Sequence, residues 1–348
     1  MVCIPWHRFS LVVNHPQVTA WLVMQANLGL AKNTLEAYAR ALEEYLQFSL
    51  HYSVAINEAS RAHIAMYVHD LAHRPRKRGL TDRSMDIGAG LANATLQQKL
   101  TALRLYYDYL MEEGHRETNP IGRGRYTPGK GFGGTRERGL IPRFRKLPWI
   151  PTDELWQRIL EVARTEALRN RVMLALAYDA ALRREELCAL ATGDIDPAHR
   201  LLRIRAETTK NRQERVVPYS TATSELYARY LQHRSTLSRA RGPLFLSESR
   251  RNKARPISLW TWTKVIEAIA ARAGVPQFTT HTLRHLCLTD LARAGWDIHE
   301  IAAFAGHRSI LTTLQYIHLS GRDLAAQYER SIATIHAGRI EMLRERLE

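Results

Sequence analysis

The chain has 348 residues, 45% of them apolar, so it can bury a core and has the length of two ordinary domains. Its 50 Lys and Arg against 34 Asp and Glu give a net charge of +16, which indicates a polyanionic partner: nucleic acid first, an anionic membrane surface second. No CxxC pair, signal-peptide pattern or apolar run near the roughly 18 residues of a membrane span is present. A cytoplasmic, nucleoid-associated protein without membrane contact is therefore expected.

Residues 1–120 are predicted to form a helical unit. Apolar and aromatic residues recur every three or four positions over 34–49, as on one face of an α-helix. Similar stripes predict helices over 60–72 and 94–113. Between these two helices lies a basic run that is either a solvated loop or a contact to phosphate. Its members are Arg74, Arg76, Lys77 and Arg78.

Residues 121–150 are predicted to form a basic linker. They carry eight basic residues against one acidic residue, together with seven Gly and three Pro, which disfavour regular structure. The segment is either a solvated hinge or a strap that lies along DNA. On the second interpretation, its candidate DNA contacts are Arg123, Arg125, Lys130, Arg143, Arg145 and Lys146.

Residues 151–323 are predicted to mix helices with one β-hairpin, whose strands cover 201–205 and 215–218. The predicted helices cover 153–164, 167–182, 221–233, 259–272, 281–294, 298–305 and 310–318. The tail, 324–348, is amphipathic with four basic and four acidic residues, so it suits packing on its own core or on a neighbouring subunit. The expected fold class is mainly α with a small β-hairpin or sheet.

Several polar residues of this second unit could carry chemistry. Each alone has an ordinary interpretation: a surface charge, an exposed lysine in a turn, a core histidine or a packed tyrosine. In chain order they are Arg183-x-x-Glu186-Leu187, Lys210 at the hairpin tip, His281-x-Leu-Arg284-His285, Gly306-His307 and Tyr316.

This order and spacing resemble the signature of tyrosine recombinases, the phage integrase and Xer-type family. The hairpin from Lys210 to Pro218 and the N-terminal stretch Asn33-Thr34-Leu35-x-x-Tyr38 extend the resemblance over about residues 16–330. Two departures stand out. Ala180-Ala181 replaces the Thr-Gly pair that is frequent in the family, and the linker is longer than usual.

The resemblance implies a helical, SAM-like core-binding domain over 1–120 and an α+β catalytic domain over 151–323. It implies a site-specific recombinase of the integrase or transposase type, as carried by mobile elements, that acts on double-stranded DNA sites as a tetramer of identical subunits. Strands would be cleaved and rejoined through a 3′-phosphotyrosyl intermediate with no cofactor, metal or ATP. The implied catalytic residues are Arg183, Lys210, His281, Arg284, His307 and Tyr316.

The chemistry of these side chains fits the implied reaction. The Tyr316 phenol would attack phosphorus, and two arginines would hold the charged phosphate oxygens with bidentate forks. Lys210 would protonate the leaving 5′ oxygen, His307 would donate to the phosphate, and His281 would act as general base or further donor.

Four more residues receive supporting roles. Glu186 would orient an arginine or cap a helix, and His285 would support the site from behind. Arg184 and Arg308 would face DNA.

Three other functions are compatible with parts of the pattern. A type IB topoisomerase shares the catalytic residue types, and a DNA-binding protein that has lost activity would share the charge. A zinc hydrolase could use His281 and His285, one helical turn apart, but Thr282 follows the first histidine where zinc proteases of this type have Glu.

Overall fold

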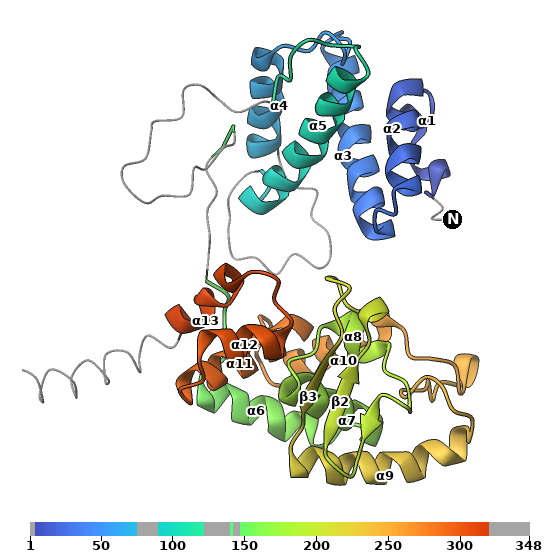
Figure 1. The fold of residues 1–348 in the computed structure, drawn as a ribbon, viewed down its shortest axis with the longest axis vertical. Helices are drawn as coiled ribbons and strands as arrows, with labels where there is room; N and C mark the ends of the chain where they lie inside the picture. The colour runs from blue at the N-terminus through green and yellow to red at the C-terminus, as the bar shows by residue number, and fades with distance from the viewer. Residues whose placement is uncertain (1–3, 75–89, 122–139, 142–146, 320–348) are drawn as a thin grey trace, which may run out of the picture. The chain divides into compact units, whose positions relative to one another are not determined.

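The computed structural model describes residues 4–74, 90–121, 140–141 and 147–319. The chain divides into two compact units, Met1–Lys146 and Leu147–Glu348 (Figure 1). None of the described helices is long and apolar enough to cross a membrane. The expectation of a mainly helical protein with a small sheet is confirmed.

The first unit is helical throughout its described residues. The three predicted helices are present, and α1 and α2 precede them without having been predicted. After a 3₁₀ turn at Trp6–Arg8, the helices are α1 (Ser10–Val13), α2 (Pro16–Asn27), α3 (Lys32–His51), α4 (Arg61–His73) and α5 (Asn93–Glu112).

The core of this unit is aromatic and carries one buried chain of hydrogen bonds. The Tyr107 hydroxyl donates to the Ile56 carbonyl oxygen (2.8 Å) and therefore accepts from the Tyr45 hydroxyl, 2.7 Å away. Both tyrosine side chains are fully buried. Leu140 and Ile141, within the predicted linker, also pack against this core.

The second unit surrounds a three-stranded antiparallel sheet of order β1-β2-β3. The predicted hairpin is its β2–β3 pair, with Ile204 opposite Arg215, and the two-residue strand β1 was not predicted. The strands are β1 (Ile195–Asp196), β2 (Leu201–Ile204) and β3 (Arg215–Pro218). The helices are α6 (Asp153–Ala163), α7 (Leu168–Asp179), α8 (Arg184–Cys188), α9 (Thr221–Leu237), α10 (Leu259–Arg272), α11 (Thr280–Arg293), α12 (Ile298–Ala305) and α13 (Leu314–Leu319). Three 3₁₀ turns lie at Ala206–Thr208, Arg250–Asn252 and Ile310–Thr312.

Helix α7 ends three residues before the predicted limit at 182, and α8 follows separately. Ala181 adopts a left-handed conformation (φ 46°), and the Leu182 N–H bonds back to the Ala177 carbonyl (3.1 Å). This pairing closes the helix in the manner usually served by glycine. Ala181 stands at the position where the family that the sequence resembles often has glycine. Its left-handed backbone conformation costs a residue with a side chain about 1 kcal/mol relative to glycine.

The buried hydrogen bonds of Tyr107 in the first unit yield a stability prediction. Replacing Tyr107 with Phe leaves the Tyr45 hydroxyl and the Ile56 carbonyl buried without this partner. We expect Tyr107→Phe to lower the free energy of unfolding by about 1–3 kcal/mol. Chemical denaturation measures this change. Tyr109→Phe, at a half-buried tyrosine of the same helix, is the control, and equal stability of the two variants would contradict the assignment.

Candidate active site

Four of the predicted catalytic side chains of the second unit, Arg183, Arg284, His307 and Tyr316, lie around the end of helix α12. The predicted site residues come from five parts of the chain. Arg183 immediately precedes α8, Lys210 lies in the loop between β2 and β3, His281, Arg284 and His285 lie on α11, His307 follows α12, and Tyr316 lies on α13.

The last carbonyl groups of α12 and the glycine after it accept hydrogen bonds from several elements. Carbonyl groups at a helix C-terminus lack partners within the helix and carry a partial negative charge, so they attract cationic donors. The pairs are Arg215 Nε to Phe304 O (3.1 Å), Arg284 Nη2 to Ala305 O (2.6 Å), Asn211 Nδ2 to Gly306 O (3.1 Å) and, at the limit of hydrogen bonding, Arg183 Nη2 to Gly306 O (3.5 Å).

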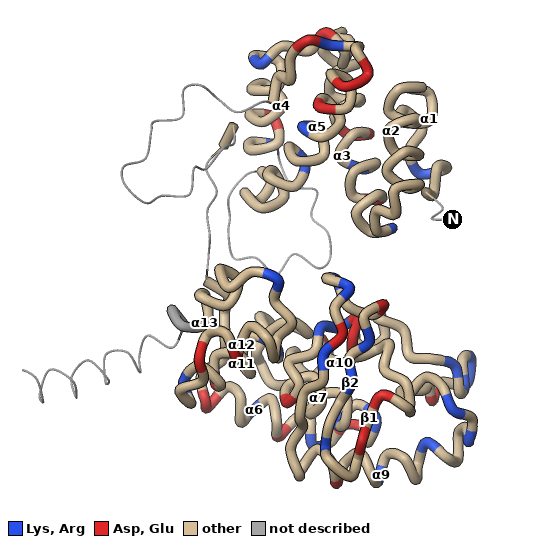
Figure 2. Tube along the Cα trace, in the orientation of Figure 1, with Lys and Arg blue, Asp and Glu red and all other residues tan. Residues whose placement is uncertain are grey.

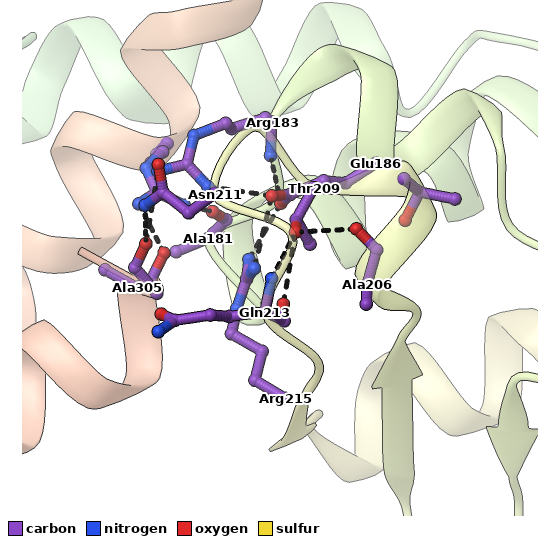
Figure 3. Close-up of polar contacts among 12 residues, drawn as sticks. Ala181, Arg183, Glu186, Ala206, Thr209, Asn211, Gln213, Arg215 and Ala305 are labelled. Atoms are coloured by element: carbon purple, nitrogen blue, oxygen red, sulfur yellow. Dashed lines mark hydrogen bonds and ion pairs between the residues drawn. The ribbon is translucent and has the colours of Figure 1, made fainter. Parts of the chain in front are cut away.

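A buried carboxylate lies between two of these arginines. Glu186 accepts from the Arg183 backbone N–H (3.0 Å) and Nη1 (2.8 Å), and from Arg215 Nη1 (3.1 Å) and Nη2 (2.7 Å), as Figure 3 shows. Burial alone would raise the pKa of Glu186, but hydrogen bonds and charge from Arg215 and Arg183 lower it to about 2. The carboxylate therefore stays ionised and holds both guanidinium groups.

Arg284 is the most deeply buried cation of the site, with 1% of its surface exposed. It donates to the Ala181 carbonyl oxygen from Nη1 (2.6 Å) and to Ala305 from Nη2. Burial and the charge of Arg183 lower its pKa to about 10, which leaves it charged at neutral pH. The left-handed turn after α7 thus supplies one of the two carbonyls that hold Arg284 in place.

Tyr316 is also buried, with 1% of its surface exposed. Its hydroxyl lies 3.1 Å from His285 Nδ1, and its ring is parallel to that of His307, with centroids 5.9 Å apart. His307 Nδ1 in turn lies 2.9 Å from Thr313 Oγ1. Burial raises the pKa of Tyr316, partly offset by the charge of Arg284, so the free phenol is protonated.

The histidines of the site are neutral at neutral pH. Burial, then neighbouring cations, lowers the pKa of His307 to about 3. Burial, then His281 and Arg284, lowers that of His285 to about 4. Desolvation and the charge of Arg284 also lower the pKa of His281.

The surroundings of His281 and Lys210 differ from what the sequence led us to expect, and two further residues join the site. His281 is exposed and its ring is nearly perpendicular to that of His285 (4.6 Å between centroids), whereas the tyrosine hydroxyl contacts His285. Lys210 is exposed, and its neighbour Asn211 ties the loop to Gly306. Arg215 and Asn211 were not identified from the sequence. Their only signal was membership of the hairpin that carries Lys210.

The expected DNA contacts divide into described and undescribed residues. Arg74 forms ion pairs with Asp70 and Glu44, and Arg184 pairs with Glu185. Arg308 is exposed. Basic and acidic residues are interspersed over both units in Figure 2. The other predicted DNA contacts, and the tail 324–348, lie outside the described residues. These contacts are Arg76, Lys77, Arg78, Arg123, Arg125, Lys130, Arg143, Arg145 and Lys146.

Among the described residues, no third metal ligand accompanies His281 and His285. Across residues 4–74, 90–121, 140–141 and 147–319, no three His, Cys, Asp or Glu side chains are grouped as a metal site would require.

Comparison with known proteins assigns the family. The model of the phage integrase family matches residues 149–322, half of the chain, and the model of the phage integrase N-terminal SAM-like domain matches residues 21–114. The chain belongs to the phage integrase family. It is therefore a tyrosine recombinase, a member of a class of enzymes that break and rejoin DNA strands.

Relatives in this family match nearly the whole chain. A tyrosine recombinase XerC from Herpetosiphon aurantiacus is 27% identical, covering 90% of this chain and 93% of its own length. A XerD from Oceanobacillus iheyensis is 26% identical, covering 86% and 92%.

Two solved structures share the fold. One is the XerH site-specific recombinase in a post-cleavage complex with palindromic difH, with a TM-score of 0.63 and 19% identity, covering 86% of this chain and 79% of that one. The other is the Tn1549 transposon integrase in complex with transposon right-end DNA, with a TM-score of 0.63 and 15% identity, covering 88% of this chain and 96% of that one.

The lowered pKa of Glu186 yields a second prediction. A carboxylate with a folded pKa of about 2, against 4.5 when unfolded, stabilises the fold by roughly 3 kcal/mol above pH 5 and loses this contribution as pH falls toward 2. Glu186→Gln should therefore unfold more easily at pH 7 by about that amount, and the gap should narrow as the pH falls.

Unfolding free energies measured between pH 3 and pH 7 test this expectation. Glu185→Gln, which alters an exposed carboxylate in the same helix, should change stability by less than about 1 kcal/mol. If wild type and Glu186→Gln differ in unfolding free energy by the same amount at pH 3 and at pH 7, the buried charge is not the source of the difference.

Proposed function

We propose that this chain recombines double-stranded DNA at specific sites, with Tyr316 as the nucleophile and Arg183 and Arg284 as the phosphate clamp. The observation that carries the proposal is the convergence of two anchored guanidinium groups and one buried tyrosine on the end of α12. The enzyme acts on DNA as an assembly of identical subunits, in the cytoplasm at the nucleoid. The match to the SAM-like N-terminal domain favours a recombinase over a type IB topoisomerase.

The two arginines suit the charge that develops during phosphoryl transfer. Each guanidinium has five N–H donors and uses only part of them on the carbonyl and carboxylate oxygens described above, so others remain for phosphate oxygens. These hydrogen bonds hold both guanidinium groups in place before the substrate arrives. A site whose dipoles and charges are already oriented spends little free energy on reorganisation during the reaction.

Tyr316 and Lys210 act on opposite sides of the phosphorus. The phenol oxygen forms the new P–O bond, the bond to the 5′ oxygen breaks, and Lys210 gives that oxygen a proton. The phosphotyrosyl ester retains the energy of the broken bond, so rejoining needs no ATP. Fixed cations fill the electrostatic role that Mg²⁺ has in other phosphoryl-transfer enzymes.

His307 completes the phosphate site. Its ring is fixed by stacking on Tyr316 and by the contact of Nδ1 with Thr313. When Nδ1 accepts from the threonine hydroxyl, Nε2 carries the proton and donates it in a hydrogen bond to a phosphate oxygen.

Trapping the covalent intermediate tests the nucleophile. On a suicide substrate whose cleaved strand diffuses away, wild-type protein should accumulate a protein–DNA adduct, detected by denaturing gel, in excess chelator. Tyr316→Phe should bind the same DNA with unchanged affinity and give no adduct. An adduct in the Phe variant, or none in the wild type on DNA that it binds, would refute the assignment.

A modified leaving group tests Lys210. Lys210→Ala should slow cleavage by about 10²–10⁴ while DNA affinity changes little, because it removes a general acid. A 5′-phosphorothiolate substrate, whose sulfur leaves without a proton, should restore the rate.

The control changes an exposed side chain in the same turn. Gln213 contributes its backbone groups to the turn, so Gln213→Ala should leave the rate on both substrates unchanged. If the thiolate does not rescue Lys210→Ala, another group is the acid.

A further inference from the structure

The contact between His285 and Tyr316 gives the nucleophile a partner that the sequence does not reveal. His285 Nδ1 lies 3.1 Å from the tyrosine hydroxyl, and the tyrosine is buried. The two residues are 31 positions apart, on α11 and α13, which pack against each other. A neutral imidazole nitrogen at hydrogen-bonding distance from a phenol can receive its proton.

We propose that His285 is the general base that removes the Tyr316 proton during DNA cleavage. This inference rests on the proposed role of Tyr316 as nucleophile. In the step, the phenol proton moves to His285 Nδ1 as the phenol oxygen bonds to phosphorus. The P–O5′ bond breaks, and the 5′ oxygen takes a proton from Lys210. Rejoining reverses both transfers, so no proton is gained or lost over a full cycle.

The other groups around the phenol are less suited to accept this proton. The His307 ring lies parallel to the tyrosine ring, and its Nδ1 faces Thr313. Arg183 and Arg284 are cations. Glu186 already accepts four hydrogen bonds from Arg183 and Arg215.

Several titratable groups face His285 from the elements packed around it. They are His281 and Arg284 on its own helix, Tyr316 on α13 and His307 after α12. Where α11 contacts α7, Tyr178 donates to Asp290. Burial above all, then His281 and Arg284, lowers the pKa of His285 and keeps its imidazole neutral in the free enzyme. A DNA phosphate brought to the arginines adds negative charge, which favours the imidazolium that forms when the proton moves.

The pH dependence of cleavage separates a base from a merely structural histidine. We choose single-turnover cleavage of the 5′-phosphorothiolate substrate, because its leaving group needs no acid and the profile then reports only on the base. Between pH 6 and 9, the wild-type rate should be independent of pH. In His285→Asn, whose amide keeps a polar group near Nδ1 but cannot take a proton, only phenolate already present can react.

His285→Asn should therefore be slower at pH 7 by about 10²–10⁴, and its rate should rise about tenfold per pH unit. A pH-independent profile in this variant would overturn the proposal. His285→Gln, a second polar replacement, should show the same slope, and the melting temperature and DNA affinity of both variants establish that they are folded.

His281→Asn is the matched control on the same helix. It should retain the pH-independent profile of the wild type, whatever its rate. A slope in His281→Asn and none in His285→Asn would assign the base to His281 instead.

Substitution of Tyr316 by 3-fluorotyrosine provides an independent measurement. Its more acidic phenol should raise the rate of His285→Asn at pH 7 several-fold and change the wild-type rate less. No gain in His285→Asn would contradict the proposal. An adduct formed by Tyr316→Phe would instead remove the nucleophile assignment itself, so the two failures are distinguishable.

Discussion

The site depends on the C-terminus of helix α12. Its last carbonyl groups have no partner within the helix, and they collect donors from the hairpin, from α8 and from α11. Gly306 allows the chain to turn there, with φ of 63°, and a Cβ at this position would lie 3.0 Å from Arg215 Nη1. One helix end therefore sets the relative positions of three elements of the proposed site, and a side chain at 306 would press on Arg215.

Concentrating arginines at one point requires a counter-charge, and Glu186 supplies it. Without this carboxylate, Arg183, Arg215 and Arg284 would repel one another in a poorly solvated environment. With it, Arg183 and Arg215 share one negative charge through three guanidinium hydrogen bonds, a fourth coming from the Arg183 backbone N–H, while their unused donors stay available. A phosphate that enters the site becomes the second anion of the cluster, which explains how a buried cationic site is stable both before and after DNA binds.

The sequence predicted most of the elements and several of the side chains that meet at the end of α12, because helical periodicity and motif spacing are local properties. It placed α10 and α12 at their observed limits. It was not sufficient for contacts between distant segments. Whether His281 or His285 meets Tyr316 depends on the rotation of α11 against α13, and the burial of Arg215 depends on how β3 meets α12. The two-residue strand β1 is too short to show any periodicity.

The burial of Tyr316, the proposed nucleophile, also keeps its phenol in the unreactive neutral form. Desolvation favours the neutral forms of both Tyr316 and His285, so in the free enzyme neither the phenolate nor the imidazolium is populated at neutral pH. Proton transfer between them creates an ion pair, which is costly in this environment unless other charges compensate. In the proposed step, Arg183 and Arg284 stabilise the charge that develops on the reacting phosphate, which also offsets the charge of the new imidazolium. Cleavage is thus coupled to correct placement of the phosphate, because the proton transfer becomes favourable only when that phosphate is in position.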